Sequence, residues 1–268
     1  MEQRVTVKID DGVADVKLAR PEKRNAIDPA MLAGLIEAGE GLKGRPAVRA
    51  VVLSGEGQDF CAGLDFNSFR GMRDGERPSS QLVLPPSDGP ATATAQRAAF
   101  VWTELDVPVI AAIAGNALGG GLQIALGADI RIVAPEARLA VLEIAWGLVP
   151  DMTGTQLLPE LVGRDVAMEL TLTGRVVSGV EAHALGLATQ VHTEPRRAAL
   201  DLARTIATRN PHAVRAAKRL LTISGRVDHE MGFAAERTEI STLIGSPNQV
   251  EALNARFQKR SPVFTDVI

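Results

Sequence analysis

Residues 108–122 read PVIAAIAGNALGGGL, and they join an apolar segment to a helix through a glycine-rich turn. The apolar run at 107–114 predicts a strand that is buried on both faces. The glycines at 119–121 come directly before a helix that we expect to end near Leu126. Glycine backbone can approach a ligand closely, and the first amides of a helix favour a negatively polarised oxygen. The turn therefore predicts either a ligand site or close packing of the helix against the strand.

A second turn of this kind lies at 61–64, Cys-Ala-Gly-Leu, after a buried strand expected at 50–53. Two turns that each follow a buried strand can each present one backbone N–H to a single oxygen. That arrangement is an oxyanion hole, which stabilises the negative charge that develops on a carbonyl oxygen. The sequence contains no G-x-x-x-x-G-K-[ST], and no G-x-G-x-x-G stands at a strand-to-helix turn. The NAD-binding and P-loop nucleotide classes are therefore excluded.

The segments around these turns predict a mixed α/β fold. Alternating apolar residues at 5–9 and 13–18 predict a β-hairpin, and Asp28 followed by Pro29 predicts the start of a helix. We expect an α/β core over residues 1–195 and a helical C-terminal region over residues 196–268. The helices expected from residue 195 onward span 195–209, 211–223, 229–244 and 247–258.

The middle of the chain contains one stretch without clear periodicity. Residues 70–93 are rich in Gly, Pro, Ser and Asp, which predicts a mobile flap over a site. A helix is expected at about 95–105, and short strands are expected at 129–133 and 137–141. Trp146 either packs against the apolar part of a ligand or lies in the core, and we favour the core.

Composition narrows the class of protein. The chain has 268 residues, 46% of them hydrophobic, with a formal net charge of -3, which argues against a general nucleic-acid binder. Cys61 is the only cysteine, so a disulfide framework and a Cys-rich zinc site are excluded, and we expect it to be small and buried. No apolar run reaches the ~20 residues of a membrane span, the N-terminal residues lack a secretion-signal pattern, and the four histidines have no metal-ligand spacing. We expect a cytoplasmic protein without a metal.

Several segments, taken in order, resemble one known family. The blocks at 59–65 and 108–122 resemble the two signature blocks of the crotonase (enoyl-CoA hydratase/isomerase) superfamily. Weaker similarities follow the family order at 20–27, 128–132, 171–187 and 259–264. The resemblance implies an α/β spiral of ββα units with a C-terminal helical trimerisation region. It also implies a homotrimer or a hexamer built from two trimers.

The resemblance further implies an acyl-CoA thioester substrate, with coenzyme A as part of the substrate and no separate cofactor. Its carbonyl oxygen would lie between the backbone N–H groups of Leu64 and Gly120, which would stabilise an enolate. Lys259 matches a lysine that reaches the CoA phosphate of a neighbouring subunit in relatives. The other substrate-binding positions implied by the family are Arg24, Ala26, Ala62, Gly63, Asp65, Gly119 and Gln123.

Three positions decide which reaction the family resemblance implies. Hydratases carry a glutamate where this chain has Gln123, share the glutamate at Glu143, and usually carry glycine where this chain has Asp151. An amide can orient a water molecule but cannot take its proton. The pattern therefore resembles an isomerase with Glu143 and Asp151 as its catalytic acids, and the spacing of these two resembles the dienoyl-CoA isomerases. Those enzymes carry a further acid at the position of Gln123, so the match is partial.

Alternative interpretations remain open at this point. The runner-up is a trans-2-enoyl-CoA hydratase that relies on Glu143 alone, and the third is a non-catalytic acyl-CoA binder. Asp151 also aligns with the nucleophilic aspartate of aromatic acyl-CoA dehalogenases, but a charged Glu143 would suit an aryl ring poorly. In purely structural interpretations, Asp151 caps a helix, Glu143 is a solvated strand-end acid, and Gln123 only binds backbone.

Overall fold

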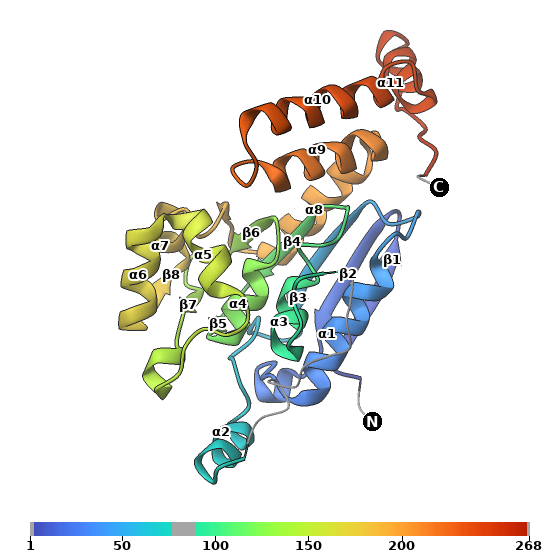
Figure 1. The fold of residues 1–268 in the computed structure, drawn as a ribbon. Helices are drawn as coiled ribbons and strands as arrows, with labels where there is room; N and C mark the ends of the chain where they lie inside the picture. Colours follow the sequence, from blue (N-terminus) through green and yellow to red (C-terminus); the bar gives the residue numbers. More distant parts are fainter. Residues whose placement is uncertain (1–2, 77–88, 267–268) are drawn as a thin grey trace.

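The structure is a computed structural model, and it describes residues 3–76 and 89–266 (Figure 1). Half of the expected flap, residues 77–88, lies outside the described residues. Within the described part of the chain, no helix is both long and apolar enough to cross a membrane.

The larger of two sheets has six strands in the order β1-β2-β3-β4-β6-β9. Its first two strands, β1 (Val5–Asp10) and β2 (Val13–Leu18), form the expected hairpin, with Val5 opposite Leu18. The turn between them uses Asp11 and Gly12, both at positive φ, as a two-residue hairpin turn requires. Every later neighbour in this sheet pairs in parallel, and its central strands are largely apolar, as is typical of strands covered on both faces.

The chain alternates between this sheet and a smaller one, whose strand order is β5-β7-β8. β3 (Ala50–Gly55), β4 (Val109–Ile113), β6 (Ile130–Val133) and β9 (Gln190–Val191) belong to the large sheet. β5 (Asn116–Leu118), β7 (Arg138–Ala140) and β8 (Val177–Ser178) belong to the small one. This repeated passage from one sheet to the other confirms the α/β spiral expected from the sequence.

Helices cover both faces of the large sheet. α1 (Pro29–Leu42), α3 (Thr94–Phe100) and α4 (Gly120–Leu126) pack over the face that carries Val51 and Leu53. α8 (Pro195–Ala207) packs on the opposite face through alanines, against Ala50 and Val52. Small side chains on α8 let it approach the strands closely. This first helix of the expected C-terminal region therefore belongs to the sheet's own core.

The remaining C-terminal helices lie together beyond the sheet, at the top of Figure 1. They are α9 (Pro211–Ile223), α10 (His229–Leu243) and α11 (Pro247–Phe257), and each agrees with its predicted helix to within one residue at either end. The sequence did not predict α2 (Phe66–Arg73) or the short 3-10 helices η1 (Pro21–Lys23) and η3 (Glu143–Trp146). The other helices are α5 (Gly154–Val162), α6 (Arg164–Thr173) and α7 (Gly179–Ala184).

Candidate active site

The two glycine-bearing turns expected from the sequence lie side by side. Cys61 donates its N–H to the Asn116 carbonyl at 2.8 Å and accepts a hydrogen bond from the Leu118 N–H at 3.0 Å. Close approach depends on glycine: a Cβ on Gly121 would stand 2.4 Å from the Cys61 carbonyl oxygen. A Cβ on Gly63, which has φ +90°, would stand 2.8 Å from the Leu118 carbonyl oxygen. The contact between the turns is therefore made of backbone on backbone.

This contact leaves two backbone N–H groups without partners at one cavity. Leu64 pairs with Ile27 in a parallel bridge whose hydrogen bonds use the amides of Ile27 and Asp65, so the Leu64 N–H points away from Ile27. Gly120 is the first residue of α4, where helical amides have no intrahelical partner. Neither amide donates a hydrogen bond within residues 3–76 and 89–266. Both residues line a cavity of 1020 Å³.

Most of the residues predicted from the sequence gather at this cavity. Arg24 and Ala26 reach it from the loop after η1, Glu143 reaches it from η3, and Asp151 reaches it from the segment before α5. Two predicted residues do not line the cavity. Gln123 is buried outside it, and Lys259 follows α11 near the C-terminus. The predicted residues that line the cavity are Arg24, Ala26, Ala62, Gly63, Leu64, Asp65, Gly119, Gly120, Glu143 and Asp151.

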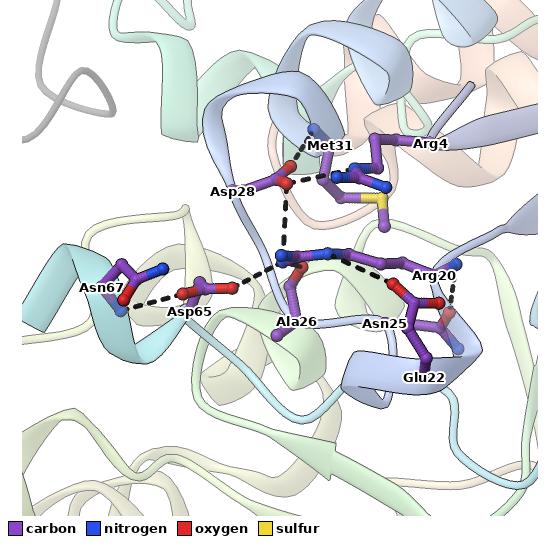
Figure 2. Close-up of polar contacts among 9 residues, drawn as sticks. All are labelled: Arg4, Arg20, Glu22, Asn25, Ala26, Asp28, Met31, Asp65 and Asn67. Carbon is purple, nitrogen blue, oxygen red and sulfur yellow. Dashed lines mark hydrogen bonds and ion pairs between the residues drawn. The ribbon is translucent and has the colours of Figure 1, made fainter. Parts of the chain in front are cut away.

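A buried arginine fixes the turn that carries Leu64 (Figure 2). The Arg20 guanidinium donates to Asp65 at 2.6 Å and to the Ala26 carbonyl at 3.1 Å, and it lies 3.4 Å from Asp28. Burial raises the pKa of Asp65, but the Asn67 N–H and the charge of Arg20 outweigh burial and lower that pKa. Asp65 is therefore an ionised anchor that ties the turn to the loop at 20–28, one residue after Leu64.

Glu143 is a buried carboxyl group at the cavity wall, with a side chain that is largely withdrawn from solvent. One of its oxygens, Oε1, accepts a hydrogen bond from Gln123 at 2.6 Å, whereas the buried Oε2 has no hydrogen-bond partner among the described residues. Burial is the main cause of its raised pKa, and the neighbouring charge of Asp151 adds to it. The interpretation of Glu143 as a solvated acid is therefore wrong.

Gln123 is fully buried, and all its polar contacts are to the protein. Its Oε1 accepts the N–H groups of Met152 and Gly154, both at 2.9 Å, while its Nε2 donates to Glu143. The two backbone donors fix which end of the amide faces the carboxylate. Gln123 thus joins Glu143 to the turn that follows Asp151, and direct substrate contact by Gln123, as the family resemblance implied, has no support in this geometry.

Asp151 lies in a turn of unusual backbone conformation. The residue that caps α5 is Thr153, so the interpretation of Asp151 as an N-cap is wrong. Thr153 has φ +72°, which is rare for a β-branched residue, and its buried hydroxyl has no hydrogen-bond partner within the described chain. The Gln123 side chain binds the amides on both sides of Thr153 and so holds this strained turn next to Glu143.

Three aromatic residues at the cavity were not predicted as site residues. Phe66 and Phe69 come from α2, and Trp146 ends η3. The expectation that Trp146 lies in the core is wrong, because it is 49% exposed, while Trp102 is the fully buried tryptophan. The i, i+3 spacing of Phe66 and Phe69 was the only signal in the sequence, since the approach of η3 to α2 is a long-range contact.

Comparisons with known proteins identify the family. The sequence model of the family described as Enoyl-CoA hydratase/isomerase matches residues 8–267. A methylglutaconyl-CoA hydratase of Mus musculus is 34% identical over 94% of this chain and 79% of its own length. An (E)-benzylidenesuccinyl-CoA hydratase of Thauera aromatica is 32% identical over 97% and 98% of the two chains. The crystal structure of an enoyl-CoA hydratase from Bacillus anthracis superposes with a TM-score of 0.87 at 31% identity, covering 98% and 99% of the two chains. The chain therefore belongs to the enoyl-CoA hydratase/isomerase family of the crotonase superfamily.

Proposed function

We propose that this crotonase-family enzyme is an enoyl-CoA isomerase, which moves a carbon–carbon double bond along the acyl chain of a CoA thioester. One observation carries the proposal: Glu143 and Asp151 both line the cavity, whereas Gln123 is an amide that faces away from it. Isomerisation needs one group that removes a proton and one that returns a proton. Two carboxyl groups can do this, whereas an amide can do neither.

In the proposed mechanism the thioester oxygen accepts hydrogen bonds from the amides of Leu64 and Gly120. The Glu143 carboxylate removes a proton from C2 of a 3-enoyl thioester, and the electron pair spreads through a dienolate onto that oxygen. Two neighbouring carboxyl groups disfavour double ionisation, so the active pair carries one proton. Asp151, when it holds that proton, delivers it to C4, and the double bond ends between C2 and C3. Proton transfer from Glu143 back to Asp151 through solvent restores the enzyme. The two amides stabilise the negative charge that develops on the thioester oxygen more than they stabilise the bound substrate. The activation barrier of the reaction is therefore lowered.

Burial of Glu143 supports its role as the base. Because burial raises its pKa, its carboxylate holds a proton more tightly than an exposed glutamate does. The unpartnered Oε2 has no competing hydrogen bond within the described chain. The carboxyl group also lies near the proposed carbonyl position, since its Oε1 is 3.2 Å from where a Cβ of Gly119 would be.

Coenzyme A is proposed to bind along the loop after η1. Arg24, Ala26 and Ala62 line the cavity on that side, and the Ala62 N–H donates to the Arg24 carbonyl at 2.9 Å. The Arg24 side chain is largely exposed and lies 3.8 Å from Asp59, a long ion pair that the negatively charged CoA phosphates would compete with. Asp65 contributes its backbone, because its carboxylate is already held by Arg20.

The proposal is tested by isomerisation of 3-enoyl-CoA and 3,5-dienoyl-CoA, followed as the conjugated thioester appears. Asp151→Asn should lower kcat by about 10²-fold or more, since general acid–base groups contribute on that scale. The exposed Asp74→Asn is the matched control and should keep full activity. Retention of isomerisation by Asp151→Asn would contradict the proposal.

A trans-2-enoyl-CoA hydratase that uses Glu143 alone is the second candidate. It is favoured by the retained Glu143 and by the hydratase activities named for the mouse and Thauera aromatica relatives. Loss of the conjugated enoyl absorbance on incubation with the enzyme would support it. Tight CoA-thioester binding without turnover of enoyl, dienoyl or β-keto substrates would instead indicate a non-catalytic acyl-CoA binder.

A further inference from the structure

Three aromatic rings meet where α2 approaches η3, and we call Phe66, Phe69 and Trp146 the aromatic cluster. Phe69 stacks on Trp146 with ring centroids 4.3 Å apart and planes 25° from parallel. Phe66 meets Trp146 edge-on, with centroids 6.4 Å apart and planes at 77°. Phe66 and Phe69 are also 6.4 Å apart and tilted by 53°. The cluster therefore presents both a ring face and ring edges.

These rings are poorly covered by the protein. Phe66 is 70% exposed, and Trp146 keeps about half of its surface accessible. All three line the same cavity as the unpartnered amides of Leu64 and Gly120. Large apolar side chains that stay accessible inside a concave wall are typical of a surface that an apolar ligand covers.

The chain itself keeps the cluster close to the proposed reaction centre. Phe66 follows Leu64 by two residues, so their Cα atoms are at most about 7 Å apart. Trp146 follows Glu143 by three residues within one 3-10 helix, a rise of about 6 Å. An acyl chain that starts between the two amides therefore reaches the cluster a few carbon atoms beyond the carbonyl.

On the basis of the proposed acyl-CoA chemistry, we propose that the aromatic cluster is the acyl-binding subsite and that it selects acyl groups carrying an aromatic ring. Aromatic pairs gain stabilisation beyond the area they bury, because ring edges and faces carry opposite partial charges. A saturated ring of the same size lacks that gain. The expected preference for the aromatic ring is about threefold to tenfold in affinity.

The aromatic ring belongs at C3 or beyond, not at the carbonyl. Glu143 lies beside Gly119, so a ring bonded directly to the thioester would meet a buried carboxyl group without a matching polar partner. One or two further carbon atoms carry the ring past Glu143 to Trp146. The subsite therefore favours arylalkanoyl and arylalkenoyl thioesters over benzoyl thioesters.

The test compares two ligands that differ only in aromaticity, 3-phenylpropionyl-CoA and 3-cyclohexylpropionyl-CoA, by isothermal titration calorimetry. Neither carries a double bond to move or hydrate, so the measurement does not depend on the reaction. We expect the phenyl ligand to bind about threefold to tenfold more tightly. Phe66→Leu and Trp146→Leu should each reduce this preference, whereas Leu221→Ala, at an exposed apolar position on α9, should leave it unchanged.

Fluorescence gives a second readout that does not require a destabilised variant. The chain has two tryptophans, and Trp102 is fully buried, so a ligand on the cluster should change the emission of Trp146 alone. The phenyl ligand should change that emission in the unmodified protein, and Trp146→Phe should abolish the change. An unaltered emission spectrum at saturating phenyl ligand would overturn the proposed stacking.

The outcomes separate this inference from the proposed function. Equal affinities, or tighter binding of the cyclohexyl ligand, overturn the inference while leaving the isomerase proposal intact. A preference for the phenyl ligand that is unchanged in both Phe66→Leu and Trp146→Leu also overturns the inference. Butanoyl-CoA, which carries no ring, is titrated as a third ligand. If it binds and neither ring-bearing ligand does, the inference alone fails. If none of the three thioesters binds, both the inference and the proposed function fail.

Discussion

A single buried amide connects the two candidate acids, which makes Gln123 a positioning residue in the proposed mechanism. Its Nε2 hydrogen bond to Glu143 favours the carboxylate and opposes the effect of burial on the pKa of Glu143. Its Oε1 holds the amides of Met152 and Gly154, which carry the turn after Asp151. A change at Gln123 should therefore alter the ionisation of Glu143 as well as the geometry of the site.

Gln123→Met should move the acidic limb of the kcat/KM profile to higher pH. Removing the donor leaves only backbone hydrogen bonds to oppose burial and the charge of Asp151, so the pKa of Glu143 rises further, and the proposed base loses its ionised form at a higher pH. Gln156→Met, on the exposed start of α5, is the matched control. If the acidic limb of the pH profile does not shift while kcat falls, Gln123 acts only on the geometry of the site.

Glu143→Gln should stabilise the fold at neutral pH. The folded-state pKa of Glu143 is raised by burial, so the folded state binds this proton more tightly than the unfolded state. The resulting stability is fully present below the unfolded pKa and is lost as the pH rises through the folded pKa. The variant avoids that loss, and its advantage in free energy of unfolding should vanish in acid.

Urea unfolding at a series of pH values measures this difference directly. Glu37→Gln, on the exposed side of α1, provides the control and should show no comparable pH dependence. If Glu143→Gln is less stable than the unmodified protein at neutral pH, the prediction is wrong. Contacts other than the Gln123 hydrogen bond would then offset the cost of burying the Glu143 carboxylate.

At the level of elements, the site depends on how closely α4 approaches the turn at 61–64. Gly121→Ala should lower kcat by about 10²–10³-fold, the scale of losing one oxyanion-hole donor, because the new Cβ would strike the Cys61 carbonyl at 2.4 Å and push the two turns apart. Substrate affinity should change less than kcat, since the amides bind the enolate more strongly than the ground state.

Gly41→Ala gives a matched comparison, because it is the same substitution inside a helix where a Cβ would meet nothing within 4 Å. It should stabilise the protein by about 0.5–1 kcal/mol through helix propensity and leave kcat unchanged. Full activity in Gly121→Ala would show that the two turns need not touch for the reaction.

Local signals explain why some elements were predictable and others were not. The starts of α9, α10 and α11 are set by Asn210, Asp228 and Ser246, whose side chains accept hydrogen bonds from helix amides two or three residues later. α2 is also capped, by Asp65, but that carboxylate is held by Arg20, 45 residues earlier in the chain. A cap that depends on a distant partner cannot be inferred from neighbouring residues.

The same distinction applies to the site. The glycines at 63 and 119–121 and the acids Glu143 and Asp151 occur in motifs, and most of the predicted residues line the cavity. The role of Gln123 depends on partners 20 to 31 residues away, which no local pattern encodes. Trp146 looked like a core residue because apolar character alone does not distinguish a core from the wall of a cavity.

At the scale of the whole molecule, the C-terminal helices carry large apolar side chains that are exposed to solvent in the single chain. Several large apolar side chains of α10 and α11 are more than half exposed, and this surface lies on the part of the chain beyond α8. Such a surface is typical of an interface, so we expect the protein to sediment as a trimer or a hexamer. The side chains concerned are Met231, Phe233, Ile240 and Phe257.

We expect Lys259 to link the predicted assembly to the proposed substrate. It follows α11 in a left-handed conformation and does not line the cavity of its own chain, so a contact with CoA would have to be made in a neighbouring subunit. Lys259→Ala should raise the KM for an acyl-CoA several-fold through the lost phosphate contact. The KM for the matching acyl-pantetheine, which lacks the nucleotide, should not change.

Mixed assemblies test whether the contact crosses the subunit boundary. Lys259→Ala chains keep intact acids with a weakened CoA contact, and Glu143→Gln chains keep Lys259 without the proposed base. When the two variants are refolded together, sites with Glu143 from one chain and Lys259 from its neighbour should regain the low KM of the unmodified enzyme. A population that shows only the raised KM of the Lys259→Ala protein would place the lysine outside the neighbouring site, because the trans arrangement requires this complementation.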